Sequence, residues 1–159
     1  MEIERKFLLD DFPDLPVLEE SVLYQGYLCT KPVARIRSRK QADGVVTYEL
    51  CFKGEGTLVR QEIELPIEEK VFSGLAELIG KPLVRKDFKA FRLPGGEKLE
   101  CSLVDAGTPW EFRYAEVEFP TVEAANAFAP PEFLGREVTE EASFSMSSYW
   151  TKTRLNAEG

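Results

Sequence analysis

The chain has 159 residues, of which 43% are hydrophobic and 30% are charged, so it can form one domain with its own core. Its net charge of −8 argues against a surface that attracts nucleic acid or anionic membranes non-specifically. The sequence contains no histidine, which excludes His-based triads, His general bases and His metal ligands. We therefore expect a single domain over residues 1–159, with no nucleic-acid or membrane partner.

The cysteines and the hydropathy pattern bear on location. Cys29, Cys51 and Cys101 are odd in number, widely spaced and without a C-x-x-C motif, which indicates free thiols rather than a disulfide frame or a zinc site. No apolar run reaches the ~18 residues that a membrane span needs. The acidic first residues do not resemble a secretory leader. We expect a cytoplasmic protein.

The first nine residues alternate in polarity. Glu2, Glu4 and Lys6 fall on one face of an extended chain, and Ile3 and Phe7 fall on the other. This period of two predicts a strand. The polar face is either half of a metal and phosphate site or a strand surface that meets water. On these nine residues alone, we favour the second interpretation.

Seven further segments have strand character, and short turns rich in glycine, proline or aspartate join most of them. The expected strands are residues 22–30, 33–40, 45–53, 58–65, 83–93, 98–104 and 111–119.

Three segments favour helices. Apolar residues recur at helical spacing over 68–79, and Gly80 and Pro82 end that element. Thr121 can cap a short helix that ends at Phe128, and residues 140–154 predict a final helix. With eight strands joined by short turns, the natural architecture is an α+β fold: an eight-stranded antiparallel sheet or closed β-barrel with helices packed outside.

The polar faces of the strands are biased in the sign of their charge. Like charges two positions apart on a strand lie about 7 Å apart and repel by roughly 0.6 kcal/mol in water, or roughly 2.4 kcal/mol at an effective dielectric near 20. If these faces line a cavity, acids and bases must oppose one another. The candidate inward bases are Lys6, Arg35, Arg37, Arg39, Lys53, Arg60 and Lys86, and the candidate acids are Glu2, Glu4, Glu62, Glu64, Glu116 and Glu118.

Two kinds of ligand would balance such a cavity. A polyphosphate would neutralise the bases, and Mg²⁺ or Mn²⁺ would neutralise the acids, because these ions prefer oxygen ligands. Cations on the phosphates and metal at the reacting phosphorus are the components of phosphoryl transfer. From charge pattern alone, a β-domain with a solvated charged face remains the alternative.

A series of motifs resembles a known family. They are Glu2–Lys6 (E-x-E-x-K), Tyr24–Leu28, Arg35–Arg37 (R-x-R), Leu50–Gly54, Arg60–Glu64, Glu116–Glu118 and Glu137–Glu140. In this order and spacing they resemble the CYTH superfamily, also called triphosphate tunnel metalloenzymes, over almost the whole chain. The resemblance implies an eight-stranded antiparallel tunnel that binds a triphosphate together with a divalent metal ion.

The resemblance also implies roles for individual residues. Metal positions of the family fall on Glu2, Glu4, Glu116 and Glu118, and less directly on Glu62 and Glu64. Phosphate-contacting positions fall on Lys6, Arg35, Arg37, Lys53 and Arg60, with Arg39 as a further member. Lys6 and Tyr27 resemble a pair that orients or activates the attacking water in the bacterial tripolyphosphatase branch. Lys6 can equally serve as a plain phosphate contact.

The sequence departs from the family pattern at some positions. Phe88 stands where a second basic residue is expected, and Ser102 stands near an expected carboxylate, for which Glu100 or Asp105 can substitute. We expect hydrolysis of inorganic tripolyphosphate. The alternatives are hydrolysis of a nucleoside or thiamine triphosphate, adenylate cyclase activity, or a weakened module that only binds polyphosphate or nucleotide.

The aromatic residues near the C-terminus leave two uses open. Phe144, Tyr149 and Trp150 can form a homodimer interface or pack onto the barrel. We favour packing onto the barrel.

Overall fold

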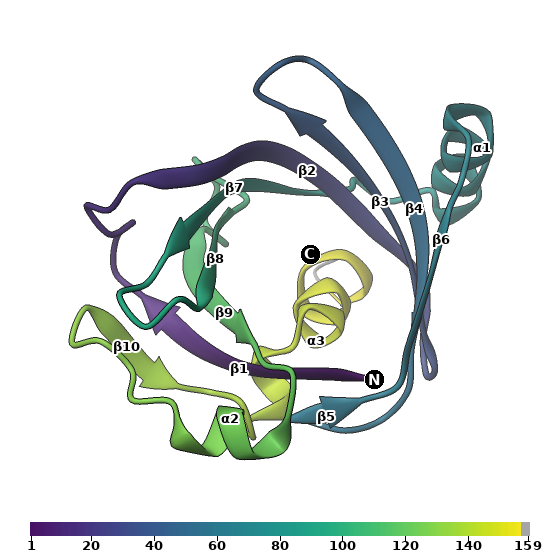
Figure 1. The fold of residues 1–159 in the computed structure, drawn as a ribbon. Helices are drawn as coiled ribbons and strands as arrows, with labels where there is room; N and C mark the ends of the chain where they lie inside the picture. The colour runs from purple at the N-terminus through teal and green to yellow at the C-terminus, as the bar shows by residue number, and fades with distance from the viewer. Residues whose placement is uncertain (157–159) are drawn as a thin grey trace.

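The computed structural model describes residues 1–156, and its ten strands form one antiparallel sheet that curls into a barrel (Figure 1). The strands are β1 (Glu2–Leu9), β2 (Val17–Thr30), β3 (Val33–Gln41), β4 (Val46–Lys53), β5 (Val59–Arg60), β6 (Glu62–Pro66), β7 (Val84–Arg92), β8 (Lys98–Val104), β9 (Phe112–Glu118) and β10 (Leu134–Glu137).

The barrel closes through the segment that contains β5 and β6. The sheet runs in the order β1-β9-β8-β7-β2-β3-β4-β6, and β5 pairs with β1. Arg60 lies opposite Glu2, whereas Glu62 lies opposite Lys53. The strand expected over 58–65 is therefore divided at Gln61, because its two halves hydrogen-bond to different neighbours. Counted as one, these halves complete the eight wall positions expected.

Two further strand expectations need correction. β2 begins at Val17, before the expected start at Val22. β10 lies outside the expected set and pairs with the second half of β1, where Phe7 lies opposite Glu137.

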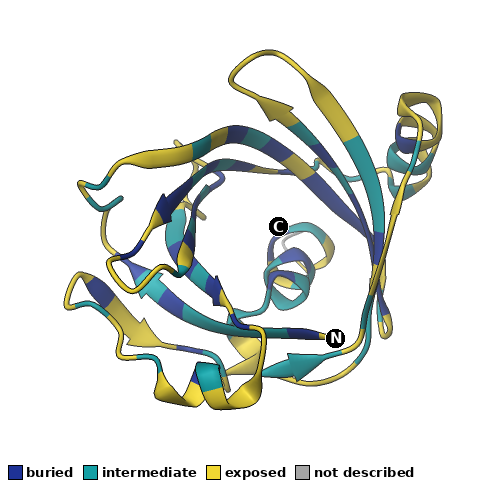
Figure 2. Ribbon diagram, in the orientation of Figure 1, coloured by how far each residue is buried: buried dark blue, intermediate teal, exposed yellow. Residues whose placement is uncertain are grey.

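The main hydrophobic core lies on the outer face of the wall. Phe7, Leu99 and Val117 point away from the barrel axis and are at most 1% exposed. They pack with residues of α2 (Val122–Ala127) and of the segment that follows it. Figure 2 shows buried positions along β1. Because the apolar face of each of these strands packs on the outside of the barrel, the opposite, polar face points into the barrel interior.

Helices α1 (Glu69–Ile79) and α2 lie outside the barrel, as expected (Figure 1). Phe72 of α1 packs against Tyr48 on the outer face of β4, with ring centroids 5.1 Å apart. Gly80 ends α1 in the left-handed conformation, and Thr121 caps α2 by accepting a bond from the Ala124 amide. No helix within residues 1–156 is long and apolar enough to cross a membrane.

The C-terminal segment differs from the expected helix over 140–154. It consists of a 3₁₀ turn η1 (Ala142–Phe144), helix α3 (Met146–Trp150) and a π-helical turn η2 (Thr151–Leu155). The break falls at Ser145, whose backbone is extended and whose hydroxyl caps α3.

Helix α3 also does not pack on the outer wall. It lies across one end of the barrel, seen through the barrel in Figure 1. There Trp150 packs against Tyr27 with ring centroids 5.6 Å apart. We call residues 142–150 the floor of the barrel. Trp150 is 1% exposed, so the expectation that this aromatic residue packs onto the barrel is confirmed. A homodimer remains a prediction.

Candidate active site

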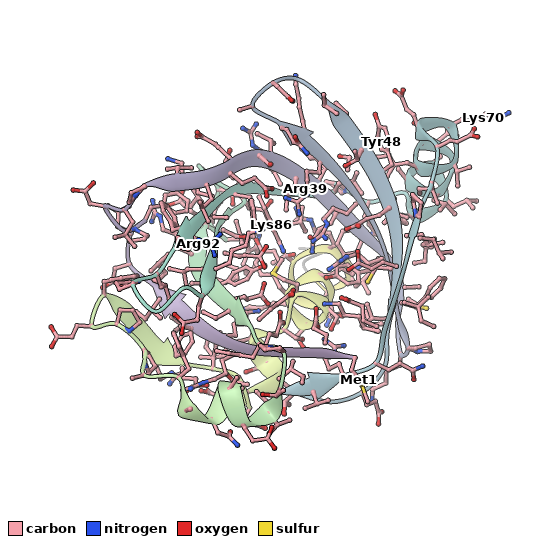
Figure 3. All side chains as sticks on the ribbon, viewed as in Figure 1. Met1, Arg39, Tyr48, Lys70, Lys86 and Arg92 are labelled. Atoms are coloured by element: carbon pink, nitrogen blue, oxygen red, sulfur yellow. The ribbon has the colours of Figure 1, made fainter. Side chains whose placement is uncertain are left out.

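The barrel interior contains a cavity of about 240 Å³ that reaches from the floor towards the open end. All candidate residues line it: Glu2, Glu4, Lys6, Tyr27, Arg35, Arg37, Arg39, Lys53, Arg60, Glu62, Glu64, Lys86, Glu116 and Glu118. Figure 3 shows Arg39 and Lys86 pointing into the barrel, while Lys70 of α1 points away from it. Strand alternation explains this convergence, because every second side chain of a barrel strand faces inward.

Two arginines of β3 form a cationic wall. Arg37 donates from Nε to Glu49 at 2.7 Å, and Arg35 Nη2 lies 3.9 Å from the same carboxylate. Arg35 is buried, and its Nε has no hydrogen-bond partner among the described residues. A buried donor without a partner costs about 1–3 kcal/mol. Arg35 therefore lines the cavity and carries a donor that the described residues leave unsatisfied.

Two lysines converge on Tyr114, a residue that the sequence interpretation did not single out. Lys86 Nζ donates to the Tyr114 hydroxyl. Lys6 Nζ lies 4.2 Å from the centre of the Tyr114 ring and donates to the Phe144 carbonyl at 2.6 Å. Burial lowers the pKa of both lysines, although the negative charge of Glu116 opposes that effect. Tyr114 shares the inward face of β9 with Glu116, so strand alternation could have identified it.

An acidic group lies on β1 and β9. Carboxylate oxygens of Glu2, Glu4 and Glu118 lie within 4.8 Å of one another. Burial and the charges of Glu116 and Glu2 raise the pKa of Glu4 to about 10. Burial alone would raise the pKa of Glu116, but the charge of Lys6, a bond with Glu4 and Lys86 lower it to about 2.

This acidic group fits a divalent metal ion. Its donors are all carboxylate oxygens, which hard cations such as Mg²⁺ and Mn²⁺ prefer. The raised pKa of Glu4 shows that the protein alone does not balance these carboxylates. Glu2, Glu4 and Glu118, with Glu116 beside them, could hold such an ion.

Glu62 and Glu64 belong to a second acidic group. Their carboxylates lie within 4.8 Å of each other and of the Cys51 thiol. Lys53 Nζ lies 3.1 Å from Glu2 and 3.5 Å from Glu62, and therefore connects this group to the first. A thiol is a softer ligand than a carboxylate, so the group with Cys51 suits a hard cation less well.

Tyr27 and Arg39 line the cavity but have other partners. The Tyr27 hydroxyl accepts a bond from Gln25 at 3.1 Å, whereas the ring next to the Lys6 ammonium belongs to Tyr114. Arg39 donates to Glu19 at 2.6 Å. The functional pairing of Lys6 with Tyr27 that the resemblance implies therefore stays a prediction.

The two carboxylates offered as substitutes near Ser102 have different positions. Glu100 lines the cavity together with Ser102. Asp105 does not belong to the cavity lining; it binds Arg154 at 2.8 Å beneath the floor. The expectation that Asp105 can replace the missing tunnel carboxylate is therefore wrong, because β8 ends at Val104 and the chain turns away there.

The chain is similar to known proteins in sequence and in structure. No protein-family model matches the chain. A curated inorganic triphosphatase of Nitrosomonas europaea is 40% identical over 143 residues, which cover 90% of this chain and 92% of that protein. A crystal structure of an inorganic triphosphatase matches with a TM-score of 0.64 at 33% identity, covering 94% of this chain and 93% of that chain.

Two more distant structures share the fold. A protein from Pyrococcus horikoshii matches with a TM-score of 0.53 at 16% identity, covering 96% of this chain and 89% of that one. A putative adenylyl cyclase from Hippeastrum also matches with a TM-score of 0.53 at 16% identity, covering 79% of this chain and 83% of that one.

The fold and the site together define a class of protein: a closed antiparallel barrel whose interior carries opposed bases and acids. The similarity to the inorganic triphosphatase over nine-tenths of both chains identifies the family within this class. The chain belongs to the CYTH superfamily of triphosphate tunnel metalloenzymes, in the branch of the inorganic triphosphatases.

Proposed function

We propose that this protein hydrolyses inorganic tripolyphosphate to pyrophosphate and phosphate inside the barrel, with the help of a divalent metal ion. One observation carries the proposal: bases and acids face one cavity, and the ion pairs between them leave part of each group unsatisfied. Arg35 keeps a buried Nε donor without a hydrogen-bond partner among residues 1–156, and Glu2, Glu4 and Glu118 crowd together. A triphosphate and a metal ion would satisfy both groups, and the 40% identical relative is an inorganic triphosphatase.

In this proposal the basic residues hold the phosphates and stabilise the charge that develops during the reaction. They are Lys6, Arg35, Arg37, Lys53, Arg60 and Lys86, with Arg39 nearer the open end. Glu2, Glu4 and Glu118 hold Mg²⁺ or Mn²⁺, with Glu116 beside them. When bound, the ion supplies positive charge to the phosphate oxygens. Lys6, fixed between Tyr114 and the Phe144 carbonyl, orients the reacting end of the chain or the attacking water.

The size of the cavity favours an inorganic substrate. Its volume of about 240 Å³ is below the roughly 300–1,000 Å³ of pockets that enclose drug-sized organic ligands. Its lining consists mainly of charged and polar side chains, which suit phosphate groups. The free thiols of Cys29, Cys51 and Cys101 support the further proposal that the enzyme works in the cytoplasm.

The test is phosphate release from tripolyphosphate, ATP and thiamine triphosphate, measured side by side with Mg²⁺, with Mn²⁺ and with chelator. We expect release from tripolyphosphate that chelator stops, and much slower release from the two organic triphosphates. Faster phosphate release from ATP or thiamine triphosphate would show that an organic triphosphate, rather than tripolyphosphate, is the preferred substrate. Cyclic AMP as a product would indicate a cyclase, and binding without release would indicate a module that only binds.

A further inference from the structure

One part of the charged barrel interior is apolar. Leu23 of β2 and Phe88 and Ala90 of β7 form a buried cluster whose members are at most 5% exposed. Leu23 and Phe88 line the cavity, and Phe88 follows Lys86 by two positions on the inward face of β7. Hydrocarbon offers phosphate oxygens neither charge nor donors. The cationic lining of β7 therefore ends at Phe88.

Arg39 covers the Phe88 ring instead of facing an open site. Its guanidinium carbon lies 4.9 Å from the ring centre, and its Nη1 lies 2.6 Å from Glu19. Glu19 also lies 3.7 Å from Lys98, which begins β8 after an exposed turn at the open end of the barrel. Arg39 is therefore already paired at this end, whereas Arg35 keeps an Nε donor without a hydrogen-bond partner among the described residues.

The surroundings of Phe88 become acidic towards the open end. Glu100 on β8 and Glu118 on β9 line the same cavity. The opposite end is closed by the floor, where Phe144, Ser145 and Met146 line the cavity. Beyond the inner bases, the lining around Phe88 thus offers a phosphate chain hydrocarbon, carboxylates and an arginine that is already paired with Glu19.

We propose that Phe88 is a specificity-determining residue that limits the site to chains of three phosphates. A fourth phosphoryl group would lose water beside the Phe88 ring, and it could gain the Arg39 cation there only in competition with Glu19. This inference rests on the proposed triphosphatase function and adds the length of the substrate. The small neighbours Ser21 and Ser102, opposite Phe88 on β2 and β8, leave space for a longer side chain at this position.

The test compares kcat/KM for inorganic tripolyphosphate and inorganic tetrapolyphosphate. We expect the wild type to prefer tripolyphosphate by at least about tenfold, which corresponds to one charge-assisted contact. Phe88→Arg should lower that preference at least about fivefold, mainly through a lower KM for tetrapolyphosphate. Phe88→Leu should keep the preference. Phe133→Arg adds the same charge at a 40% exposed position outside the barrel and should change neither value.

Other outcomes would overturn the inference. They are equal use of both chains by the wild type, or an unchanged preference in Phe88→Arg. If Phe88→Arg does not fold, Phe88→Gln decides, because it removes the apolar ring without adding charge and should also lower the preference. If the wild type releases no phosphate, the proposed function fails. Calorimetric binding of the two chains then tests Phe88 separately, and equal affinities would overturn its role.

Discussion

Two clusters of buried charge within residues 1–156 differ in what satisfies them. Beneath the floor, Asp105 is 7% exposed, and both of its oxygens accept bonds from Arg154, at 2.8 and 3.1 Å. The Tyr149 hydroxyl also donates to Asp105. Arg154 binds the carbonyls of Pro82 and Leu83 as well, so this cluster is complete without a ligand.

The barrel interior is arranged differently. Arg35 has a buried donor without a partner, and Glu4 is placed among other carboxylates. The pKa values reflect the contrast. Burial raises the pKa of Asp105, but bonds from Arg154 and Tyr149 outweigh burial and lower it. Burial and neighbouring acids raise the pKa of Glu4 to about 10. The charges of the Asp105 cluster are satisfied within the chain, whereas the crowded carboxylates around Glu4 leave a place for a cation.

The largest expected effect is loss of activity in Glu4→Gln. The change removes a proposed metal ligand from the barrel interior, so we expect kcat/KM for tripolyphosphate to fall about 1,000-fold, more than the 10–100-fold typical of outer-shell partners. The fold should persist, because glutamine removes a crowded carboxylate. Phosphate release and circular dichroism measure the two effects, with exposed Glu132→Gln as the matched control. Unchanged turnover in Glu4→Gln would refute the metal assignment.

Asp105→Asn should have the opposite profile. It leaves the Arg154 charge buried without its partner, so we expect a loss of about 3 kcal/mol in the free energy of unfolding. Asp105 has a φ of 47°, which asparagine tolerates. The substitution therefore adds no backbone strain to the measured loss of stability. Denaturant unfolding measures this loss, and exposed Asp14→Asn is the control. Turnover of the folded Asp105→Asn protein should change little. A large loss of activity at normal stability would contradict the distinction.

The two clusters should also respond to pH with opposite signs. Asp105 has a lowered pKa in the fold, so its contribution is present above its unfolded pKa of about 3.9 and is lost as pH falls through the folded value. Glu4 has a raised pKa, so its cost to stability grows as pH rises from about 4.3 towards 10.

Unfolding curves from pH 3 to pH 9, in chelator, check this contrast. The difference in the free energy of unfolding by which Asp105→Asn falls below the wild type should shrink below about pH 4. Glu4→Gln should gain stability relative to wild type as pH rises. Differences that run in the same direction for both variants would contradict the account.

The smallest expected effect is that of Tyr114→Phe. The ring beneath Lys6 is kept, but Lys86 loses the hydroxyl to which it donates. We expect kcat/KM for tripolyphosphate to fall about tenfold, the size of one hydrogen bond to a charged group. Steady-state kinetics measure it, with Tyr48→Phe on the outer face of β4 as the control. Equal kinetics for the wild type and Tyr114→Phe would show that the contact with Lys86 does not matter.

The sequence was sufficient to predict that the charged faces of the strands line the cavity. Alternation placed Glu2, Glu4 and Lys6 on one face, and the structure puts all three in the cavity lining. The same rule applies to Arg35 and Arg37 on β3. This succeeded because side-chain direction in a strand depends only on local geometry.

Contacts that depend on register or on distant segments could not be predicted. Glu49 binds Arg37 because the two lie opposite each other on β3 and β4. Asp105 meets Arg154 because the floor returns beneath the barrel. The division at Gln61 follows from closure of the barrel, and the break at Ser145 depends on the path of the floor. These features require the tertiary fold, which no local pattern contains.

The central claim is that the unpaired charges of the barrel interior receive a triphosphate. Calorimetric titration of tripolyphosphate into the metal-free protein, at low and high salt, tests it most directly. We predict saturable binding of one tripolyphosphate per chain that weakens with salt and is lost in Arg35→Gln, which removes the buried unpaired donor. No saturable binding, or equal affinity in Arg35→Gln, would contradict the account.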